Sequence, residues 1–599
     1  MSRQRILSVY PKFPPSFWGF QFALRFLGKP ATMPPTGLAT VAAMIPEKYF
    51  EVQGIIDTNV RPLTNRDIEN TDLIFTSSMI VQRDSLDELI KRAHAYGKKV
   101  VAGGPYPTSY RDRVDADYLV LNEAETTLGP FLEDLLQGSA EKVYDEKSVA
   151  SRNRTLPLTR EGKPLITHTP LPRWDLLDLN NYASLAIQYS RGCPFHCNFC
   201  DITALFGYES RTKTPAQMIA ELESVYATGW RGQLFIVDDN FIGNKRNVRV
   251  LLPEIARWQK EQRYPFSFFT EASMDLGMPN HADILKGMVD AGFDQVFLGI
   301  ESVDPEVLKK MDKGQNLGNP YHKVRAIQEA GLEVTGGFII GGDGEKPSVF
   351  DDLFKFIQTT GIVMPMPGLL TALKDTKLYA QLKEEGRLVS ESTGNNTHQL
   401  GFNFKPELDE TFLIKGYVNL LERLFDPKNY YERCRVLASR RGTYHATSRT
   451  TRAGVQALSH ILYEKLIRRP EWAFVRYVSG TLLRNPREFP EAIAHAVKLY
   501  HFETMTDATS KLYSYPKHTE TLYERFQQHV HTLKGNIGAR LHEIERLEQT
   551  ILDEAKRRYD RLHKDFRQGA QEAFESLRER IAYTRNEYSG LLIGSAPFH

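Results

Sequence analysis

The sequence predicts an α/β protein with two successive parallel-sheet units and a mostly helical C-terminal region. Three observations support this prediction. Short β-branched or apolar runs alternate with helical patterns over the first 140 residues, and the same alternation resumes near residue 184. Beyond about residue 400 the strand-like patterns disappear and most of the sequence has helical periodicity. Strands separated by helices are typical of parallel sheets that helices cover.

Composition limits the class of protein before any motif is considered. The chain has 599 residues but only four cysteines, which excludes a disulfide framework and favours a reducing compartment. No run approaches the ~18 uninterrupted apolar residues of a membrane span, and the N-terminus lacks a signal-peptide pattern, so we expect a cytoplasmic protein. A formal net charge of +2 gives no reason to expect nucleic acid as a partner.

The first unit, residues 1–140, contains five predicted strands: RILSVY, FEVQGIID, TDLIFTSS, KKVVAGG and DYLVLNE. Open parallel sheets bind ligands at the carboxyl ends of their strands. Those ends carry small and polar residues, namely Ser77, Ser78, Gly103, Gly104, Asn122 and Glu123. Residues 141–180 lack periodicity and are rich in charge and proline, so we interpret them as a linker.

The second unit, residues 181–395, contains the strand candidates SLAIQYS, GQLFIVDD, PFSFFTEAS, DQVFLGIES, LEVTGGFII and a weaker one near GLLTALK. About six strand–helix repeats predict a partial (β/α)6 barrel, in which the chemistry lies at the carboxyl ends of the strands.

The remaining chain divides into a helical domain at 396–505 and a terminal segment at 506–599. In the terminal segment apolar residues recur at spacings of mostly three and four, which predicts one long amphipathic helix or a helical hairpin. Its apolar stripe packs on its own chain or on a second subunit in a homo-oligomer. The alternative is peripheral contact with a membrane surface.

Three cysteines lie within eight residues, in RGCPFHCNFC. Cys193, Cys197 and Cys200 form C-x-x-x-C-x-x-C directly after a predicted strand. Thiolates this close can share one soft metal centre, but three of them leave one coordination position open. The alternative is a zinc knuckle or an accidental cluster. Cys434 lies in a helical pattern and is interpreted as a buried structural thiol.

RGCPFHCNFC resembles the signature of the radical S-adenosylmethionine (SAM) enzymes. The resemblance implies that the three cysteines hold a [4Fe–4S] cluster, that SAM binds its open iron, and that cleavage of SAM gives a 5′-deoxyadenosyl radical. VDDNFIG, TEAS, GIES and GFIIGGDGE resemble the places where this family contacts SAM. The implied SAM contacts are Phe199, Asp238, Asp239, Asn240, Glu271, Glu301, Ser302 and Gly341.

The first unit resembles the flavodoxin-like (Rossmann-like) cobalamin-binding domain that precedes the radical SAM domain in one branch of the family. MPPTGLATVAAMIP, TSSMIVQ, VAGGPYPTS and LNEAETTLG match its landmarks in order. The implied cobalamin contacts are Ser77, Ser78, Met79, Gln82, Gly103, Gly104, Pro105, Asn122 and Glu123. The D-x-H-x-x-G motif that supplies a cobalt-ligating histidine is missing, and a cofactor-free domain is the alternative.

PRWDLLDL and FDPKNYYER narrow the resemblance to the subgroup that is similar to hopanoid C-2 methylase. It implies cobalamin-dependent methylation of an unactivated carbon in an apolar small molecule, such as a polycyclic lipid, with electrons from flavodoxin or ferredoxin. The alternatives are cyclisation, C–C bond formation or rearrangement without net methyl transfer, and a cluster-bearing scaffold. No catalytic side chain is assigned.

The aromatic N-terminal segment PKFPPSFWGFQFALRF has two interpretations of equal weight. Phe13, Phe17, Trp18, Phe20 and Phe26 line an apolar substrate pocket, or they form core packing between domains.

Overall fold

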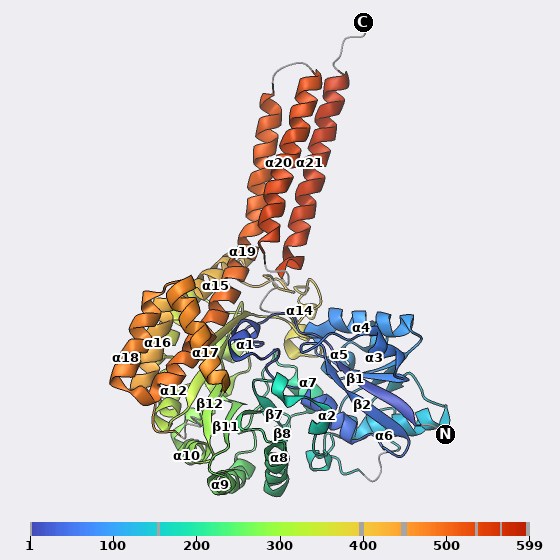
Figure 1. Cartoon of the computed structure of the whole chain (residues 1–599), viewed down its shortest axis with the longest axis vertical. Helices are drawn as coiled ribbons and strands as arrows, with labels where there is room; N and C mark the ends of the chain where they lie inside the picture. The colour runs from blue at the N-terminus through green and yellow to red at the C-terminus, as the bar shows by residue number, and fades with distance from the viewer. Residues whose placement is uncertain are drawn as a thin grey trace. The chain divides into compact units, whose positions relative to one another are not determined.

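The computed structural model describes residues 3–152, 156–394, 400–444, 452–533, 537–562 and 566–594. These residues form two compact units, the first ending at His501, and the second comprising Leu400 and the chain from Phe502 onward. Each unit is described by itself. The first unit contains both predicted sheets and the helical domain that follows them (Figure 1).

The first sheet has six parallel strands in the order β2-β1-β3-β4-β5-β6, which is the flavodoxin-like order with one added edge strand. Its strands are β1 (Gln4–Tyr10), β2 (Phe50–Asp57), β3 (Leu73–Ser77), β4 (Lys99–Gly103), β5 (Tyr118–Val120) and β6 (Val143–Tyr144). Strand β6 lies within the stretch interpreted as a linker, so the sheet extends past residue 140. Two residues are too few for a periodic signal, and pairing with β5 creates this strand.

Helices cover both faces of the first sheet, which explains its nearly continuous apolar strands. Helices α3 (Asn65–Glu69) and α4 (Arg83–Ala95) pack on one face, and α2 (Thr36–Ala43) and α6 (Ala124–Gln137) pack on the other. Alternate residues of one strand enter the two cores, as Val100 and Val101 of β4 illustrate. Short helices α1 (Gln21–Leu27) and α5 (Pro105–Ser109) complete this region.

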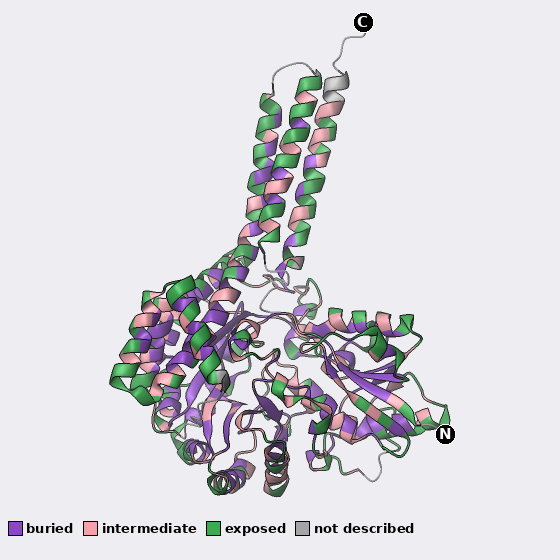
Figure 2. Cartoon of the chain, in the orientation of Figure 1, coloured by how far each residue is buried: buried purple, intermediate pink, exposed green. Residues whose placement is uncertain are grey.

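The second sheet also has six parallel strands, in the order β14-β13-β12-β11-β10-β7. They are β7 (Leu185–Ile187), β10 (Gly232–Ile236), β11 (Phe266–Ala272), β12 (Phe293–Glu301), β13 (Glu333–Ile340) and β14 (Pro365–Leu369). The weak strand predicted near GLLTALK corresponds to β14, which begins three residues earlier, in PMPGL, and shares Gly368 and Leu369 with the predicted stretch. Proline is tolerated here because β14 is an edge strand. Figure 2 shows that the strands are largely buried.

Helices follow the strands of the second sheet and complete the partial barrel. They are α8 (Pro215–Ala227), α9 (Lys245–Glu261), α10 (Ala282–Asp290), α12 (Pro320–Ala330) and α13 (Val349–Thr360). Short helices α7 (Ile202–Phe206), α11 (Pro305–Lys310) and α14 (Lys377–Glu384) lie between these elements in the sequence, and α14 packs against Phe199 of the cysteine segment. Pairing of β8 (Ser190–Arg191) with β9 (Arg211–Thr212) makes a small antiparallel hairpin around the cysteine segment.

Four helical stretches follow the barrel: α15 (Glu410–Leu424), α16 (Pro427–Arg440), α17 (Arg452–Leu462) and α18 (Trp472–Arg484). The buried Tyr417 of α15 donates a hydrogen bond to the Pro367 carbonyl of β14, at 3.3 Å, which ties this domain to the barrel edge. The boundary predicted between residues 395 and 396 lies outside the described residues. Cys434 is buried and free, as the sequence predicts.

The second unit packs the end of α19 (Phe489–Thr532) with α20 (Ile537–Asp560) and α21 (Gln568–Gly594). Three helical segments are therefore described where one long helix or a helical hairpin was predicted, since the apolar spacing of the sequence continues from one helix to the next. Ile544, Ile551 and Ile581 of the stripe are buried among these helices. The chain's own helices cover the stripe at these positions, and a homo-oligomer through the C-terminal helices stays a prediction.

Candidate functional site

The cysteine segment begins where the hairpin β8–β9 holds the chain next to strand β7. Gly192 has φ +86°, and a Cβ there would lie 2.5 Å from the Glu209 carbonyl oxygen, so only glycine fits. The Cys193 amide donates to the Gly207 carbonyl at 3.3 Å. Cys193, Cys197 and Cys200 are all half-buried and free.

The surroundings of the three thiols suit a soft metal cluster. Burial raises the pKa of Cys193 and raises that of Cys200 to about 12, so each buried thiolate needs a compensating positive charge. Asn240 Nδ2 lies 3.9 Å from Cys193 Sγ, and Gln315 Nε2 lies 3.3 Å from Cys197 Sγ. Three thiols with amide donors beside them fit an iron–sulfur cluster that leaves one iron open.

Three carboxylates lie near the cysteine segment, on neighbouring strands. Asp239 follows β10, Glu271 is in β11 and Glu301 ends β12. Burial raises the pKa of Asp239 to about 6; burial, together with the nearby Asp239 and Glu301, raises that of Glu271 to about 8. Glu301 is paired with Lys313, whose Nζ lies 2.5 Å from Glu301 Oε1. Excess negative charge in a buried place favours a cationic ligand, and SAM carries an ammonium and a sulfonium.

The side chains of three other predicted SAM contacts accept hydrogen bonds from groups of the protein itself. Asp238 accepts hydrogen bonds from the Tyr189 amide at 2.8 Å and from Ser190 Oγ at 2.7 Å, so it holds the strand that leads to the cysteines. Asn240 Oδ1 accepts from the Ser273 amide at 3.2 Å. Ser302 Oγ accepts from the Asp304 amide at 3.1 Å.

Gly341 and Phe199 lie in an apolar neighbourhood that the sequence did not reveal. Gly341 has φ +97°, and a Cβ there would lie 2.2 Å from Phe402 Cε1. Phe199 and Phe402 pack against the same buried cluster, and Lys313 Nζ lies 5.4 Å from the centre of the Phe199 ring. The glycine thus makes room for a phenylalanine ring, where the family resemblance implies an approach to the nucleoside.

The inward side of the barrel carries aromatic rings. Alternate residues of β10, β11 and β12 are less buried than their neighbours, which marks the face that points away from the helices. Phe235 and Phe269 on that face are stacked with ring centres 4.4 Å apart. Trp18 from the N-terminal segment, 45% exposed, meets Phe297 with ring centres 4.9 Å apart.

The two interpretations of the N-terminal aromatic segment therefore apply to different residues. Phe17 and Phe26 are buried and contact Phe425 and Tyr500 of the helical domain, so they belong to core packing. Trp18 is the exposed ring, over the inward face of β12. A Cβ on Gly337 would lie 2.9 Å from Phe297 Cζ, so this glycine gives the Phe297 ring its space.

A cavity of about 290 Å³ lies at the carboxyl ends of β3, β4 and β5, between α2 and α6. Six of the predicted cobalamin contacts line it: Ser77, Gly103, Gly104, Pro105, Asn122 and Glu123. Three others do not line it. Ser78 is buried, Met79 is 49% exposed, and Gln82 donates to the Pro11 carbonyl at 2.5 Å.

The cavity suits a flat heterocycle with a polar attachment. Its walls are apolar at Val41, Met44, Phe75 and Leu128. Gly104 has φ +91°, and a Cβ there would lie 2.5 Å from Ser77 Oγ. The buried Thr76 hydroxyl has no hydrogen-bond partner in the part of the chain that the structure describes. The residues present therefore fit the nucleotide tail of cobalamin, as the sequence implies.

Glu123 occupies the place where this cavity meets the cysteine hairpin. Glu123 Oε2 accepts from Arg191 Nη1 at 2.8 Å and from Arg211 Nη1 at 2.9 Å. Arg191 also pairs with Glu125 at 2.9 Å. Both arginines belong to the hairpin strands β8 and β9, so this carboxylate joins the first sheet to the segment that carries the cysteines.

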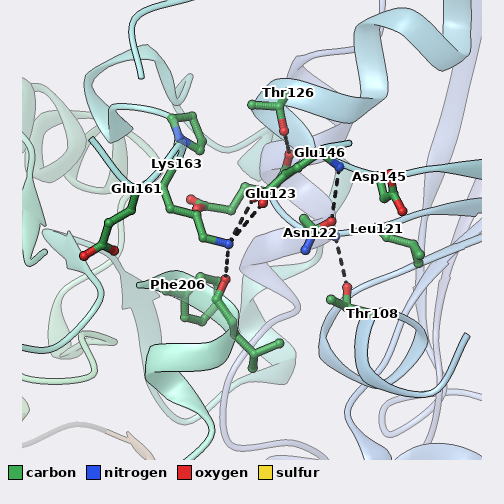
Figure 3. Close-up of polar contacts among 12 residues, drawn as sticks. Thr108, Leu121, Asn122, Glu123, Thr126, Asp145, Glu146, Glu161, Lys163 and Phe206 are labelled. Atoms are coloured by element: carbon green, nitrogen blue, oxygen red, sulfur yellow. Dashed lines mark hydrogen bonds and ion pairs between the residues drawn. The ribbon is translucent and has the colours of Figure 1, made fainter. Parts of the chain in front are cut away.

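Further polar contacts surround Glu123 (Figure 3). Lys163 Nζ donates to Glu146 Oε1 at 3.1 Å and to the Leu205 carbonyl at 2.9 Å. The Asn122 amide donates to Thr108 Oγ1 at 3.0 Å, and Asn122 itself has φ +61°. Thr126 Oγ1 donates to the Glu123 carbonyl at 2.8 Å. The end of β5 is thereby fixed by contacts within the protein.

Comparison with protein families places three models on the chain. The B12 binding domain matches residues 30–131 and the Radical SAM superfamily matches residues 187–357. A domain of unknown function, DUF4070, matches residues 376–514. The fold and the site thus define a radical SAM enzyme with a B12-binding domain, and its cofactors are a [4Fe–4S] cluster, SAM and cobalamin.

Relatives narrow this class further. An uncharacterized methyltransferase from Synechocystis sp. is 40% identical over 83% of this chain and 91% of its own length. The hopanoid C-2 methylase of Rhodopseudomonas palustris is 36% identical over 64% of this chain and 71% of its own. The chain belongs to the cobalamin-dependent radical SAM methyltransferase family that includes hopanoid C-2 methylase.

A solved structure supports the fold. The radical SAM methyltransferase TsrM from Kitasatospora setae, with cobalamin and a [4Fe–4S] cluster bound, is similar with a TM-score of 0.53. It is 16% identical, and the match covers 83% of this chain and 99% of that one. The resemblance found in the sequence is therefore confirmed. None of the described helices is both long and apolar enough to cross a membrane.

Proposed function

We propose that the protein methylates an unactivated carbon of an apolar small molecule, with a polycyclic lipid as the leading candidate. The observation that carries the proposal is the aromatic inward face of the barrel. Phe235, Phe269 and Phe297 lie on the strands that lead to the acidic SAM candidates, and Trp18 of the N-terminal segment packs against Phe297. A saturated ring system buries against such rings without unpaired polar groups.

Each part of the chain has a distinct task in this proposal. Cys193, Cys197 and Cys200 hold the cluster, and Glu271 and Asp239 balance the positive charge of SAM. The cavity at the first sheet holds the nucleotide tail of cobalamin. When bound, the cluster and SAM supply a hydrogen-abstracting radical and cobalamin supplies the methyl group. The protein orders these groups and keeps water away from them.

We propose flavodoxin or ferredoxin as the electron donor, and the reducing cytoplasm as the compartment, because the cluster cysteines must remain reduced. The shared name of several relatives, methyltransferase, favours net methyl transfer over cyclisation or rearrangement.

The test starts with anaerobic reconstitution of the cluster and supply of hydroxocobalamin, SAM, a strong reductant and polycyclic lipid candidates. We expect 5′-deoxyadenosine, S-adenosylhomocysteine and a methylated lipid, all missing in Cys197→Ala. Trp18→Ala tests the proposed substrate pocket. We expect this variant to have a higher KM for the lipid, and to form deoxyadenosine as the wild type does when no lipid is present. Deoxyadenosine formation with cobalamin bound and the candidates consumed, but no methylated product, would contradict methyl transfer.

A further inference from the structure

The end of the helical domain in the first unit exposes a set of large apolar side chains. Trp472 and Leu483 are each 84% exposed and Ile467 is 69% exposed. Tyr463, Leu466 and Leu482 are also exposed. We call these six residues, with the arginines among them, the Trp472 face. Exposed apolar groups of this size mark binding surfaces.

A wide, π-helical turn presents part of this face to solvent. The π-helical segment η9 (Tyr463–Arg468) ends where the Arg469 amide donates to the Glu464 carbonyl at 2.8 Å. The Glu471 amide donates to the Lys465 carbonyl at 3.0 Å, and Lys465 Nζ pairs with Glu471 at 2.5 Å. The bonds close the chain behind residues 466–470, which leaves Leu466 and Ile467 in solvent. π-Helical turns are rare and frequently functional.

Helix α18 continues the face with a clear division of its two sides. Phe474, Tyr477 and Val478 are buried, and Tyr477 stacks on Tyr431 with ring centres 4.8 Å apart. The opposite side carries Trp472, Arg476, Ser479 and Leu483, which recur at spacings of three and four residues. One helix side is therefore anchored, and the other presents apolar residues at both ends to solvent.

The charges of the face are mainly positive. Arg468, Arg469, Arg476, Arg484 and Arg487 lie between or beside its apolar residues. Among the described residues, Arg476, Arg484 and Arg487 form no ion pair. Two of the nearby acidic residues are already paired, since buried Glu464 pairs with Arg468 and Glu471 pairs with Lys465. The half-buried Glu488 beside Arg487 is the third. The face thus combines exposed tryptophan and leucine with unneutralised guanidinium groups.

We propose that the Trp472 face docks on the surface of an anionic lipid bilayer. Tryptophan prefers the boundary between lipid headgroups and acyl chains, where leucine and isoleucine insert slightly deeper. Guanidinium groups pair with lipid phosphates in a bidentate manner, and anionic lipids add long-range attraction. Charge complementarity favours this occupant over a second copy of the chain, which would bring like-charged arginines together. Docking would give the proposed enzyme access to an apolar substrate.

The test measures flotation of the full chain with vesicles of phosphatidylcholine alone and of phosphatidylcholine mixed with phosphatidylglycerol. We expect binding to the mixed vesicles that weakens with added salt. The variant Ile467→Ser/Trp472→Ala should bind about tenfold more weakly, and Arg476→Gln/Arg484→Gln should lose the preference for phosphatidylglycerol. Val250→Ser is the matched control, because Val250 is 59% exposed but lies on α9 of the barrel.

Thermal unfolding and deoxyadenosine formation in vesicle-free buffer, both unchanged, show that the variants are folded. Vesicle binding needs no turnover, so a failure of lipid methylation and a failure of docking are distinguishable. The proposal is overturned if the wild type does not bind mixed vesicles, or if both double variants bind as the control does. It is also overturned if the variants dissociate a dimer and leave vesicle binding intact.

Discussion

Both parallel sheets of the first unit place acidic side chains at their strand ends. The two sheets differ in whether the protein provides a positive charge beside these carboxylates. At the end of β5, Glu123 receives hydrogen bonds from two arginines, Arg191 and Arg211. At β10 and β11, Asp239 and Glu271 have no lysine or arginine paired with them among the described residues, and burial raises both pKa values.

The difference separates positioning from ligand binding. Where the protein supplies the opposite charge, the carboxylate is satisfied and its effect is to fix two segments relative to each other. Where the protein provides no opposite charge, ionisation of the buried carboxylate is unfavourable unless a cationic ligand binds beside it. Within the barrel, Glu301 is of the first kind, since Lys313 neutralises it.

The strongest test of the comparison removes a supplied charge inside the barrel. Lys313→Met leaves Glu301 buried without its partner, and breaking a buried pair costs about 3 kcal/mol or more. We expect that loss in the free energy of unfolding from denaturant titration. Lys313→Met/Glu301→Gln should recover most of it. A single variant as stable as wild type would show that the pair contributes no such stabilisation.

The second test converts the paired carboxylate of the first sheet. Glu123→Gln weakens the hydrogen bonds from Arg191 and Arg211, so we expect a loss of about 2 kcal/mol in unfolding free energy. The reconstituted cluster should also change its electron paramagnetic resonance spectrum, because Arg191 lies two residues before Cys193. Glu146→Gln is the control, since Glu146 pairs with Lys163 in the same region. An unchanged spectrum in Glu123→Gln would show that Glu123 does not position the cysteine segment.

The third test addresses an unpaired carboxylate. Glu271→Gln should weaken SAM binding about tenfold above pH 8, where the wild-type side chain is ionised. Because cationic SAM favours the ionised form, wild-type affinity should rise with pH toward 8. The variant should lose this rise. Equilibrium dialysis at several pH values measures both trends, and equal profiles for the two proteins would exclude Glu271 from SAM binding.

The same substitution has the opposite effect on the protein without ligands. The pKa of Glu271 is raised from 4.5 in the unfolded chain to about 8 in the fold, so folding favours the protonated form. The contribution of Glu271 to the free energy of unfolding is therefore fully present below pH 4.5, and it is lost as the pH rises through 8. Glu271→Gln should remove this loss, and unfolding titrations at pH 5 and above pH 8 compare the two proteins.

The smallest effect is expected at an exposed pair. Lys286 Nζ lies 2.5 Å from Asp290 on α10, with side chains 77% and 48% exposed. Asp290→Asn should cost about 0.3 kcal/mol, because water screens such pairs. A cost comparable to that of Lys313→Met would show that burial does not set the difference between the two kinds of pair.

Structural elements that follow a repeating sequence pattern could be predicted from the sequence. The strand–helix alternation gave both sheets, and the cysteine spacing gave the cluster segment with its open position. The short strand β6 was missed and the start of the proline-containing β14 was placed three residues too late, because partners, not periodicity, create these strands. The terminal segment was predicted as one long helix or a helical hairpin, whereas the described residues form the end of α19, α20 and α21, because the apolar spacing does not mark where one helix ends.

The candidate site was less accessible to sequence reasoning. Lys313, Gln315, Phe297 and Phe402 carry no local motif and reach the site through the fold. Glu301 has φ +61°, a backbone strain that a sequence pattern does not show. Met79 and Gln82 follow β3 in the sequence but do not line the cavity, because the chain turns away after Ser78. The SAM and cobalamin contacts remain predictions for individual residues.

The β8–β9 hairpin, whose strands flank the cysteine segment, is held in place without help from the cluster. Contacts within the protein hold this segment: Glu123 binds both hairpin strands, and the Asp239 carboxylate accepts from the Gly192 amide at 3.0 Å. These contacts use only protein groups, so the polypeptide itself sets the backbone geometry from which the cysteines meet iron and sulfide.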